Sequence, residues 1–175
     1  ALSISGFKSF GTQDVASSIS LKQVNVLIGA NGAGKSCFAS FFNMLGYMVN
    51  GSLQHFVAEN GGANEILHFG SKKTPVMSAK LSFKNENHIN NYSFSLSKGT
   101  GDRLLFSEES LGCNEEHYNF NGDFESHLSN DVLEHNNERA LKNILKNCKV
   151  YQFHDTSKDS FLRSQSKIDD CRILK

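Results

Sequence analysis

The first 50 residues change from an alternating to a helical hydrophobic pattern. Apolar and small polar residues alternate in LSISGF (2–7) and DVASSISL (14–21), and QVNVLIG (23–29) is rich in strand-forming residues. These stretches predict three strands, the last of which leads into a glycine-rich turn. From Lys35 the apolar residues recur at helical spacing, which predicts an amphipathic helix ending near Gly51. Its apolar stripe consists of Phe38, Phe41, Phe42, Leu45, Met48 and Val49.

Downstream of this helix the pattern predicts further short elements. A short helix at 53–57 and a helical turn at 64–67 lie in a stretch rich in turn-forming residues. Alternation then predicts strands separated by the turns KNENH and SKGTGD. These strands cover residues 76–83, 89–96, 103–110 and 116–120. We therefore expect an antiparallel β-region after the first helix.

The C-terminal third is predicted to begin as a helix. Leu141, Ile144, Leu145 and Cys148 share one face at helical spacing. Residues 149–155 then predict a strand that leaves the core, and the polar tail after it predicts a loop.

A phosphate-binding motif lies between the third predicted strand and the first helix. Residues 29–36, GANGAGKS, match G-x-x-x-x-G-K-[ST] without a mismatch. Glycines let a backbone fold around an anion with its N–H groups pointing inward, and the following helix N-terminus favours phosphate. We predict that Lys35 contacts the β- and γ-phosphates of ATP and that the Ser36 hydroxyl binds Mg²⁺. The predicted ATP-binding loop comprises Gly29, Ala30, Asn31, Gly32, Ala33, Gly34, Lys35, Ser36 and Cys37, the last through its backbone N–H.

Together with ISGFKSFG (4–11), this motif resembles the N-terminal lobe of ABC-type ATPases related to SMC and RecF proteins. GGANEILHFGSKKT (61–74) and VYQFHDTS (150–157) are similar to a bacterial subgroup of predicted AAA-type ATPases, some of which accompany nucleases or reverse transcriptases in anti-phage systems. The resemblance implies an α/β fold, namely a P-loop NTPase lobe of the ABC-ATPase-head type. In such a lobe an antiparallel β-subdomain follows the Walker A helix.

The resemblance also implies nucleotide contacts outside the loop. Lys8, Ser9 and Phe10 occupy the strand end that lies against the nucleotide in SMC-like ATPases, although an ordinary turn between strands is the alternative. Gln152 occupies the position of the Q-loop glutamine, which senses Mg²⁺ and the γ-phosphate. A small shift of register would give that position to His154 or Asp155 instead.

Hydrolysis by such ATPases needs a Walker B aspartate, a following glutamate and a signature motif. The candidate Walker B, RLLFSEES (103–110), has only three consecutive apolar residues before Ser107, so we interpret it as a structural strand. We predict no catalytic residue and interpret 1–175 as a single incomplete ATPase domain. Its parts are the P-loop strands and Walker A helix at 1–50, an antiparallel β-insertion at 76–120, and a helical segment with the Q-loop strand at 126–155.

In a complete protein, the resemblance implies that ATP closes a dimer of two heads and that hydrolysis resets it. DNA and a partner nuclease are the further partners that it implies, in DNA repair or phage defence. A non-catalytic nucleotide-binding interaction module and an ABC transporter ATPase fragment are the alternatives. The transporter is disfavoured because the Walker A motif follows the SMC-like GFKSFG so early in the chain.

Charge and composition narrow these partners. The formal net charge is zero, and residues 81–140 hold eleven acids against four Lys or Arg, so no global field favours nucleic acid. Lys142, Lys146 and Lys149 form a basic stripe that is either a solvated helix face or a local phosphate contact. No apolar run approaches the length of a membrane span, and the four cysteines lack metal-binding spacing. We therefore expect a cytoplasmic protein with free thiols and no membrane partner.

Overall fold

Five antiparallel strands form a sheet in which every strand lies next to its neighbour in the sequence. The computed structural model describes residues 1–12, 18–84, 89–113, 116–120, 122–130, 136–148 and 150. The strand order is β1-β2-β3-β4-β5. The strands are β1 (Leu2–Ser5), β2 (Val76–Lys84), β3 (Ile89–Lys98), β4 (Leu104–Cys113) and β5 (Glu116–Phe120). The four strands predicted between 76 and 120 are therefore confirmed, and the first predicted strand joins them at the sheet edge.

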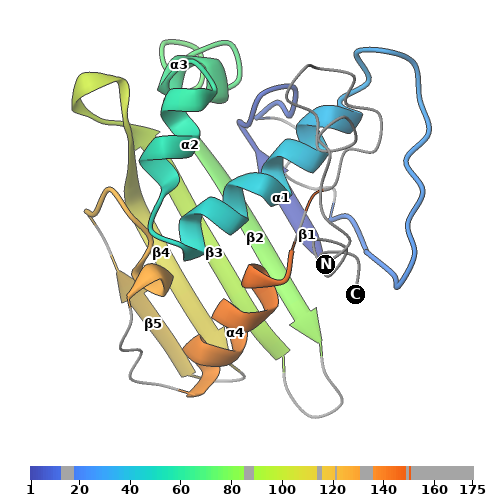
Figure 1. Ribbon diagram of the computed structural model, residues 1–175, viewed down its shortest axis with the longest axis vertical. Helices are drawn as coiled ribbons and strands as arrows, with labels where there is room; N and C mark the ends of the chain where they lie inside the picture. Colours follow the sequence, from blue (N-terminus) through green and yellow to red (C-terminus); the bar gives the residue numbers. More distant parts are fainter. Residues whose placement is uncertain are drawn as a thin grey trace, which may run out of the picture.

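Helices cover one face of this sheet, with α1, α2 and α4 lying across the strands (Figure 1). The helices are α1 (Lys35–Val49), α2 (Leu53–Glu59), α3 (Ala63–Ile66) and α4 (Asn136–Lys146), with short 3₁₀ turns η2 (Thr100–Asp102) and η3 (His127–Ser129). Each predicted helix is thus confirmed. The result is an α/β arrangement with an antiparallel sheet.

Alternation along the strands decides which side chains meet the helices. On β2, Met77, Ala79 and Leu81 are buried, whereas Ser78 and Lys80 face the other side. The apolar stripe of α1 packs onto the buried face, where the rings of Phe41 and Phe94 stack at 6.5 Å between centroids. Burial of such rings is the dominant favourable term in forming this core.

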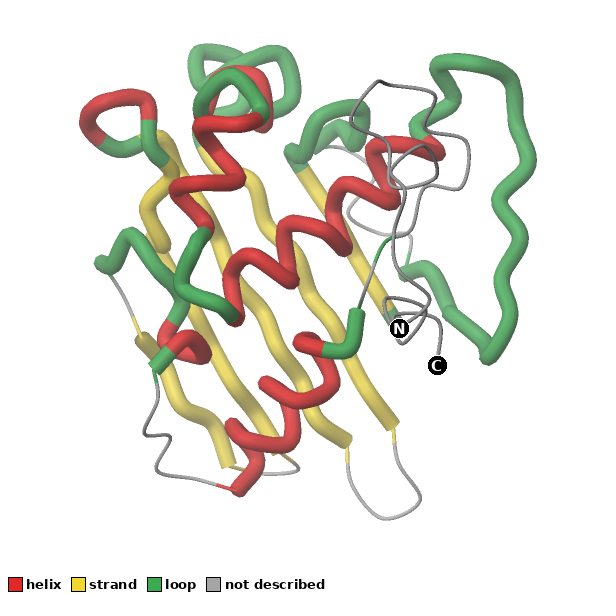
Figure 2. The backbone as a smooth tube through the Cα atoms, viewed as in Figure 1, coloured by secondary structure: helices red, strands yellow, loops and turns green. Residues whose placement is uncertain are grey.

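The predicted strand at 23–29 is wrong in this structure. Residues 24–30 have no strand pairing and form part of the long loop at the right of Figures 1 and 2. A strand needs a neighbour for its backbone hydrogen bonds, and no described segment lies in register beside it. Of the predicted strand at 14–21, Ile19 forms a single bridge with Leu2, and residues 13–17 lie outside the described part. The predicted strand at 149–155 lies outside it too, except for Val150.

Candidate functional site

The phosphate-loop motif forms the entry to α1. Gly32 and Gly34 adopt left-handed backbone angles, with φ of 84° and 88°, and Gly34 is the residue that caps the helix. These angles are strained for residues with a Cβ, which explains why glycine is needed there. The Lys35 amino group donates to the carbonyl oxygens of Gly29 and Ala30 at 2.6 and 2.7 Å. These two hydrogen bonds join the end of the loop, at Lys35, to its first residues, so the loop is closed into a ring.

Ser9 lies directly against this loop. A Cβ built on Gly34 would stand 2.9 Å from the Ser9 hydroxyl oxygen, so a side chain at position 34 would displace Ser9. Phe10 packs against Phe38 of α1, with ring centroids 6.3 Å apart. The structure thus brings two residues of the SMC-like segment to the start of α1. Ser9 is exposed beside the loop, and Phe10 packs against the helix.

The Lys8 amino group is held between α1 and the end of α2 instead of projecting freely into solvent. It donates to Ser40 Oγ at 2.9 Å and to Asn60 Oδ1 at 2.8 Å. Desolvation by burial lowers the pKa of Lys8 from its ordinary value, and a weaker electrostatic interaction with Cys37 opposes this shift. Lys8 therefore joins α1 to the end of α2 beside the phosphate loop.

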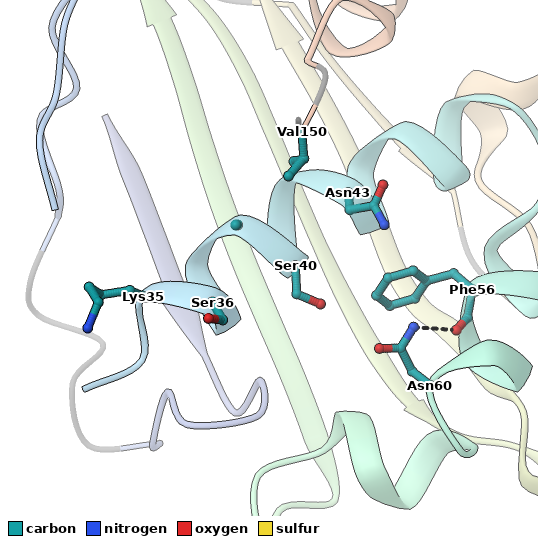
Figure 3. Close-up of a pocket in the computed structure, with 8 residues that line it drawn as sticks. Lys35, Ser36, Ser40, Asn43, Phe56, Asn60 and Val150 are labelled. Atoms are coloured by element: carbon teal, nitrogen blue, oxygen red, sulfur yellow. Dashed lines mark hydrogen bonds between the residues drawn. The ribbon is translucent and has the colours of Figure 1, made fainter. Parts of the chain in front are cut away.

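A groove of about 550 Å³ continues from the loop along α1. Lys35 and Ser36 line one end, and the side chains of Ser40 and Asn43 follow along the helix, with Asn60 on the far wall (Figure 3). Ala39, Phe56 and Val150 complete the lining. Sequence reasoning missed this groove because it joins α1 to α2, and only the polar positions on α1 between the apolar ones hinted at it.

The segment that precedes the loop exposes apolar side chains. Val24, Val26 and Ile28 are 81%, 77% and 91% exposed. Isolated exposed apolar residues are ordinary, but three at alternating positions of one extended segment form a strand-like surface. In this structure the described residues leave that surface uncovered.

The glutamates of the candidate Walker B stretch lie away from the loop, in β4. That strand pairs antiparallel with β3 and β5, which confirms the prediction of a structural strand. Glu109 is buried and accepts hydrogen bonds from Tyr92 Oη and from the His127 backbone N–H, at 2.7 and 2.8 Å. Ser126 Oγ also donates to it. Its hydrogen bonds therefore hold β3, β4 and η3 together.

Two further predictions concern Gln152 and the basic stripe on α4. Gln152, the predicted Mg²⁺-sensing residue, lies outside the described residues, as does Lys149 of the basic stripe. The Lys142 amino group donates to the carbonyl oxygens of Ser129 and Asn130, at 3.3 and 2.9 Å. Lys142 thus holds α4 to the end of η3. Its amino group is therefore not part of a freely solvated basic face.

The residues of the loop fit a bound nucleotide and Mg²⁺. Left-handed glycines at 32 and 34 and the N-terminus of a 15-residue helix provide the anion cradle, and Lys35 supplies the cation. Ser36 is exposed next to Lys35, and its hydroxyl is the oxygen ligand that Mg²⁺ prefers. In the described part of the chain, no cluster of three or more His, Cys, Asp or Glu side chains suits a metal ion.

Comparison with known proteins assigns the chain to a family. A family model described as an AAA domain matches residues 1–173, nearly the whole chain. None of the curated proteins matches the chain. Among the described residues, no helix has the length and apolar character that a membrane crossing requires.

Proposed function

Because the chain belongs to the AAA domain family, whose members bind ATP with Mg²⁺, we propose that residues 29–36 bind the phosphates of ATP. Backbone N–H groups of the loop and the Lys35 amino group hold the phosphates, and Ser36 holds the Mg²⁺ ion. When bound, Mg²⁺ neutralises phosphate charge. The observation that carries the proposal is the ring formed by Lys35 with Gly29 and Ala30 at the N-terminus of α1.

Within this family, an SMC- or RecF-like ATPase is the specific form that we propose. The placement of Ser9 and Phe10 at the start of α1 supports it, as the resemblance requires. In such an ATPase two heads close on ATP, and DNA or a nuclease is the partner, in DNA repair or phage defence. The free thiols of Cys37 and Cys148 suit a reducing, cytoplasmic setting.

We further propose that hydrolysis needs residues beyond those of the site described above. Val24, Val26 and Ile28 form an uncovered strand-like surface that enters the phosphate loop. With Leu27, which is 53% exposed, residues 26–28 are apolar at three successive positions, a pattern typical of a strand in the interior of a sheet with helices on both faces. Glu109 cannot activate water at the loop while it holds β3, β4 and η3 together. The covering strands and the catalytic carboxylates thus come from further parts of the protein.

Nucleotide binding by residues 1–175 tests the phosphate-loop proposal. Isothermal titration of MgATP compares the wild-type chain with Lys35→Ala and with Lys80→Ala, an exposed lysine of β2 on the other face of the sheet. A hydrogen bond to a charged group contributes about 1.5–3 kcal/mol, so Lys35→Ala is expected to weaken binding at least about tenfold. Lys80→Ala is expected to bind as the wild type does. Equal affinity of Lys35→Ala and wild type contradicts the proposal.

A non-catalytic nucleotide-binding module is the second candidate. The observation that favours it is the structural use of Glu109, the buried one of the two glutamates in the stretch that most resembles Walker B. Turnover measurements separate the candidates. Sustained ATP hydrolysis by residues 1–175 contradicts the need for further residues, whereas a longer protein that binds ATP without hydrolysing it supports the module.

A further inference from the structure

The Lys8 side chain is a cation whose described hydrogen-bond partners are both neutral. Its amino group donates to Ser40 Oγ and Asn60 Oδ1 and lies 5.9 Å from the centre of the Phe56 ring. None of the ion pairs between described residues includes Lys8. A partly buried charge is costly unless an opposite charge offsets it, and burial accordingly lowers the pKa of Lys8. The described surroundings of Lys8 thus supply no counter-ion.

The backbone of Lys8 is strained as well. Its φ of 45° is left-handed, which among the described non-glycine residues is shared only with Phe69 and Asp102. Lys8 N–H donates to the Ile66 carbonyl at 2.7 Å, and His68 Nδ1 lies 2.6 Å from the Lys8 carbonyl oxygen, so the loop after α3 holds Lys8 in place. Left-handed backbone is unfavourable for a residue with a Cβ and is common at functional sites. The fold thus maintains an unfavourable conformation at the residue that places a cation between α1 and α2.

The two partners of Lys8 line the groove that runs along α1. In Figure 3 the Ser40 hydroxyl and the Asn60 amide oxygen point toward the same space, whereas the Lys35 side chain points away from it. Because Ser40 Oγ accepts from Lys8, its own hydrogen is left to donate, and no described residue accepts it. The Asn43 amide also lines the groove and makes no hydrogen bond with the described residues. The groove therefore offers hydrogen-bond donors beside a positive charge, and none of the described residues that line it is acidic.

The geometry points to a second oxyanion site in this groove, in which the Ser40 hydroxyl contacts a phosphate or carboxylate group and Lys8 supplies the positive charge. Asn43, three residues after Ser40 and therefore its neighbour on the helix surface, is the further donor. These two residues follow Ser36 by four and seven positions, so the site lies about 6–10 Å further along the helix axis. It binds a different group from the one that Lys35 holds, and it does not depend on the proposed function.

A small anionic molecule fits this groove better than nucleic acid does. The volume of about 550 Å³ lies in the range of small-molecule sites, and Ala39, Phe56 and Val150 provide apolar walls beside the polar groups. Nucleic-acid interfaces need many phosphate contacts from a basic surface, whereas this chain has no net charge. The ligand class is thus a small molecule that carries a phosphate or carboxylate group.

Lys8→Gln and Ser40→Ala remove the two parts of the site separately. Glutamine keeps an amide donor but loses the charge, which should weaken anion binding at least about tenfold. Ser40→Ala removes one neutral donor, so a loss of about 2- to 10-fold is expected. Lys80→Gln, which changes an exposed lysine of β2, is the matched control and should bind as the wild type does. Thermal denaturation verifies the folding of each variant, and Ser40→Ala provides the test if Lys8→Gln does not fold.

NMR titrations of residues 1–175 with inorganic phosphate, succinate and a single-stranded oligonucleotide decide the case. The Asn43 side-chain amide reports on the groove, and the Gly34 backbone N–H reports on the phosphate loop. We expect phosphate, succinate or both to shift the Asn43 signal with equal affinity in the wild type and in Lys35→Ala, and with weaker affinity in Lys8→Gln. A response to phosphate alone or to succinate alone supports the site and identifies the charged group of its ligand.

Three results would overturn this second site. They are an Asn43 signal that neither small anion shifts, an affinity that is equal in the wild type, Lys8→Gln and Ser40→Ala, and a shift that disappears in Lys35→Ala because the anion in the phosphate loop causes it. A Lys8-dependent shift with the oligonucleotide alone assigns the groove to nucleic acid and also overturns it. An unchanged response of Gly34 to phosphate in Lys35→Ala instead contradicts the proposed function and leaves this site intact.

Discussion

Two regions of the molecule invert the usual distribution of polar and apolar groups. One is the core on the helix-covered face of the sheet, and the other is the segment that precedes the phosphate loop. Beneath η3, the buried carboxylate of Glu109 accepts hydrogen bonds from Tyr92, Ser126 and the His127 backbone. Before the loop, Val26 and Ile28 carry apolar side chains that the described residues leave in solvent. The first region buries a carboxylate and satisfies it with hydrogen bonds. The second region exposes apolar side chains of a kind that proteins normally bury.

This difference separates structural from functional parts of the chain. A buried carboxylate is tolerated only where its lone pairs are satisfied, so the Glu109 network must form whenever the sheet folds. The segment before the loop is exposed throughout residues 24–30, so its conformation depends on what binds the loop or covers these residues. Stability should therefore respond to changes in the first region, and binding to changes in the second.

Glu109→Gln should give the largest loss of stability among the changes that test this contrast. The amide places a donor where Tyr92, Ser126 or His127 already donates, which leaves a buried hydrogen-bonding group unpaired. We expect the free energy of unfolding to fall by about 1–3 kcal/mol, measured by urea denaturation. The neighbouring Glu108 is exposed on the other face of β4, so Glu108→Gln should change it by less than about 0.5 kcal/mol. Equal losses in the two variants would show that the buried network does not stabilise the fold.

An intermediate effect is expected for Tyr92→Phe at alkaline pH. Burial raises the pKa of Tyr92 well above its ordinary value, and the Glu109 carboxylate raises it further. The folded protein then keeps a proton that the unfolded chain loses, so the free energy of unfolding falls as pH rises above about 10. Tyr92→Phe should lose about 1 kcal/mol at neutral pH because Glu109 loses one donor, and its stability should fall less steeply at alkaline pH.

Urea denaturation between pH 8 and pH 11 measures that slope. Tyr47→Phe is the comparison, because the pKa of Tyr47 is raised chiefly by its hydrogen bond to Glu59 near the surface. A slope in Tyr92→Phe as steep as in the wild type would assign the alkaline loss of stability to other groups.

The sequence predicts the elements whose stabilising partners are close in the chain. The stripe of α1 and the alternation of β2 to β5 are visible as patterns, and both appear in the structure. The strand at 23–29 was predicted from the same kind of pattern and is absent, because a strand also needs a neighbour that no local pattern supplies.

The glycine-rich turn at the start of α1 could likewise be predicted from the motif, but its surroundings could not. The anchoring of Lys8 by Ser40 and Asn60 joins residues that are 32 and 52 positions away in the sequence. The left-handed backbone of Phe69 has only Gly70 beside it as a hint, because tertiary contacts with the Lys8 loop impose it. These features arise from packing between distant segments, which a local pattern does not encode.

The smallest effect on stability is expected from Val26→Ser combined with Ile28→Ser. Both side chains are exposed, so the free energy of unfolding of residues 1–175 should change by less than about 0.5 kcal/mol per site. An uncovered apolar segment with a strand-like pattern favours pairing with other chains, so the double variant should associate less in sedimentation experiments. Ile4→Ser, in the buried part of β1, is the contrasting control and should destabilise the fold strongly. A large loss of stability in the double variant would show that residues 1–175 themselves cover this segment, and the contrast between the two regions would then disappear.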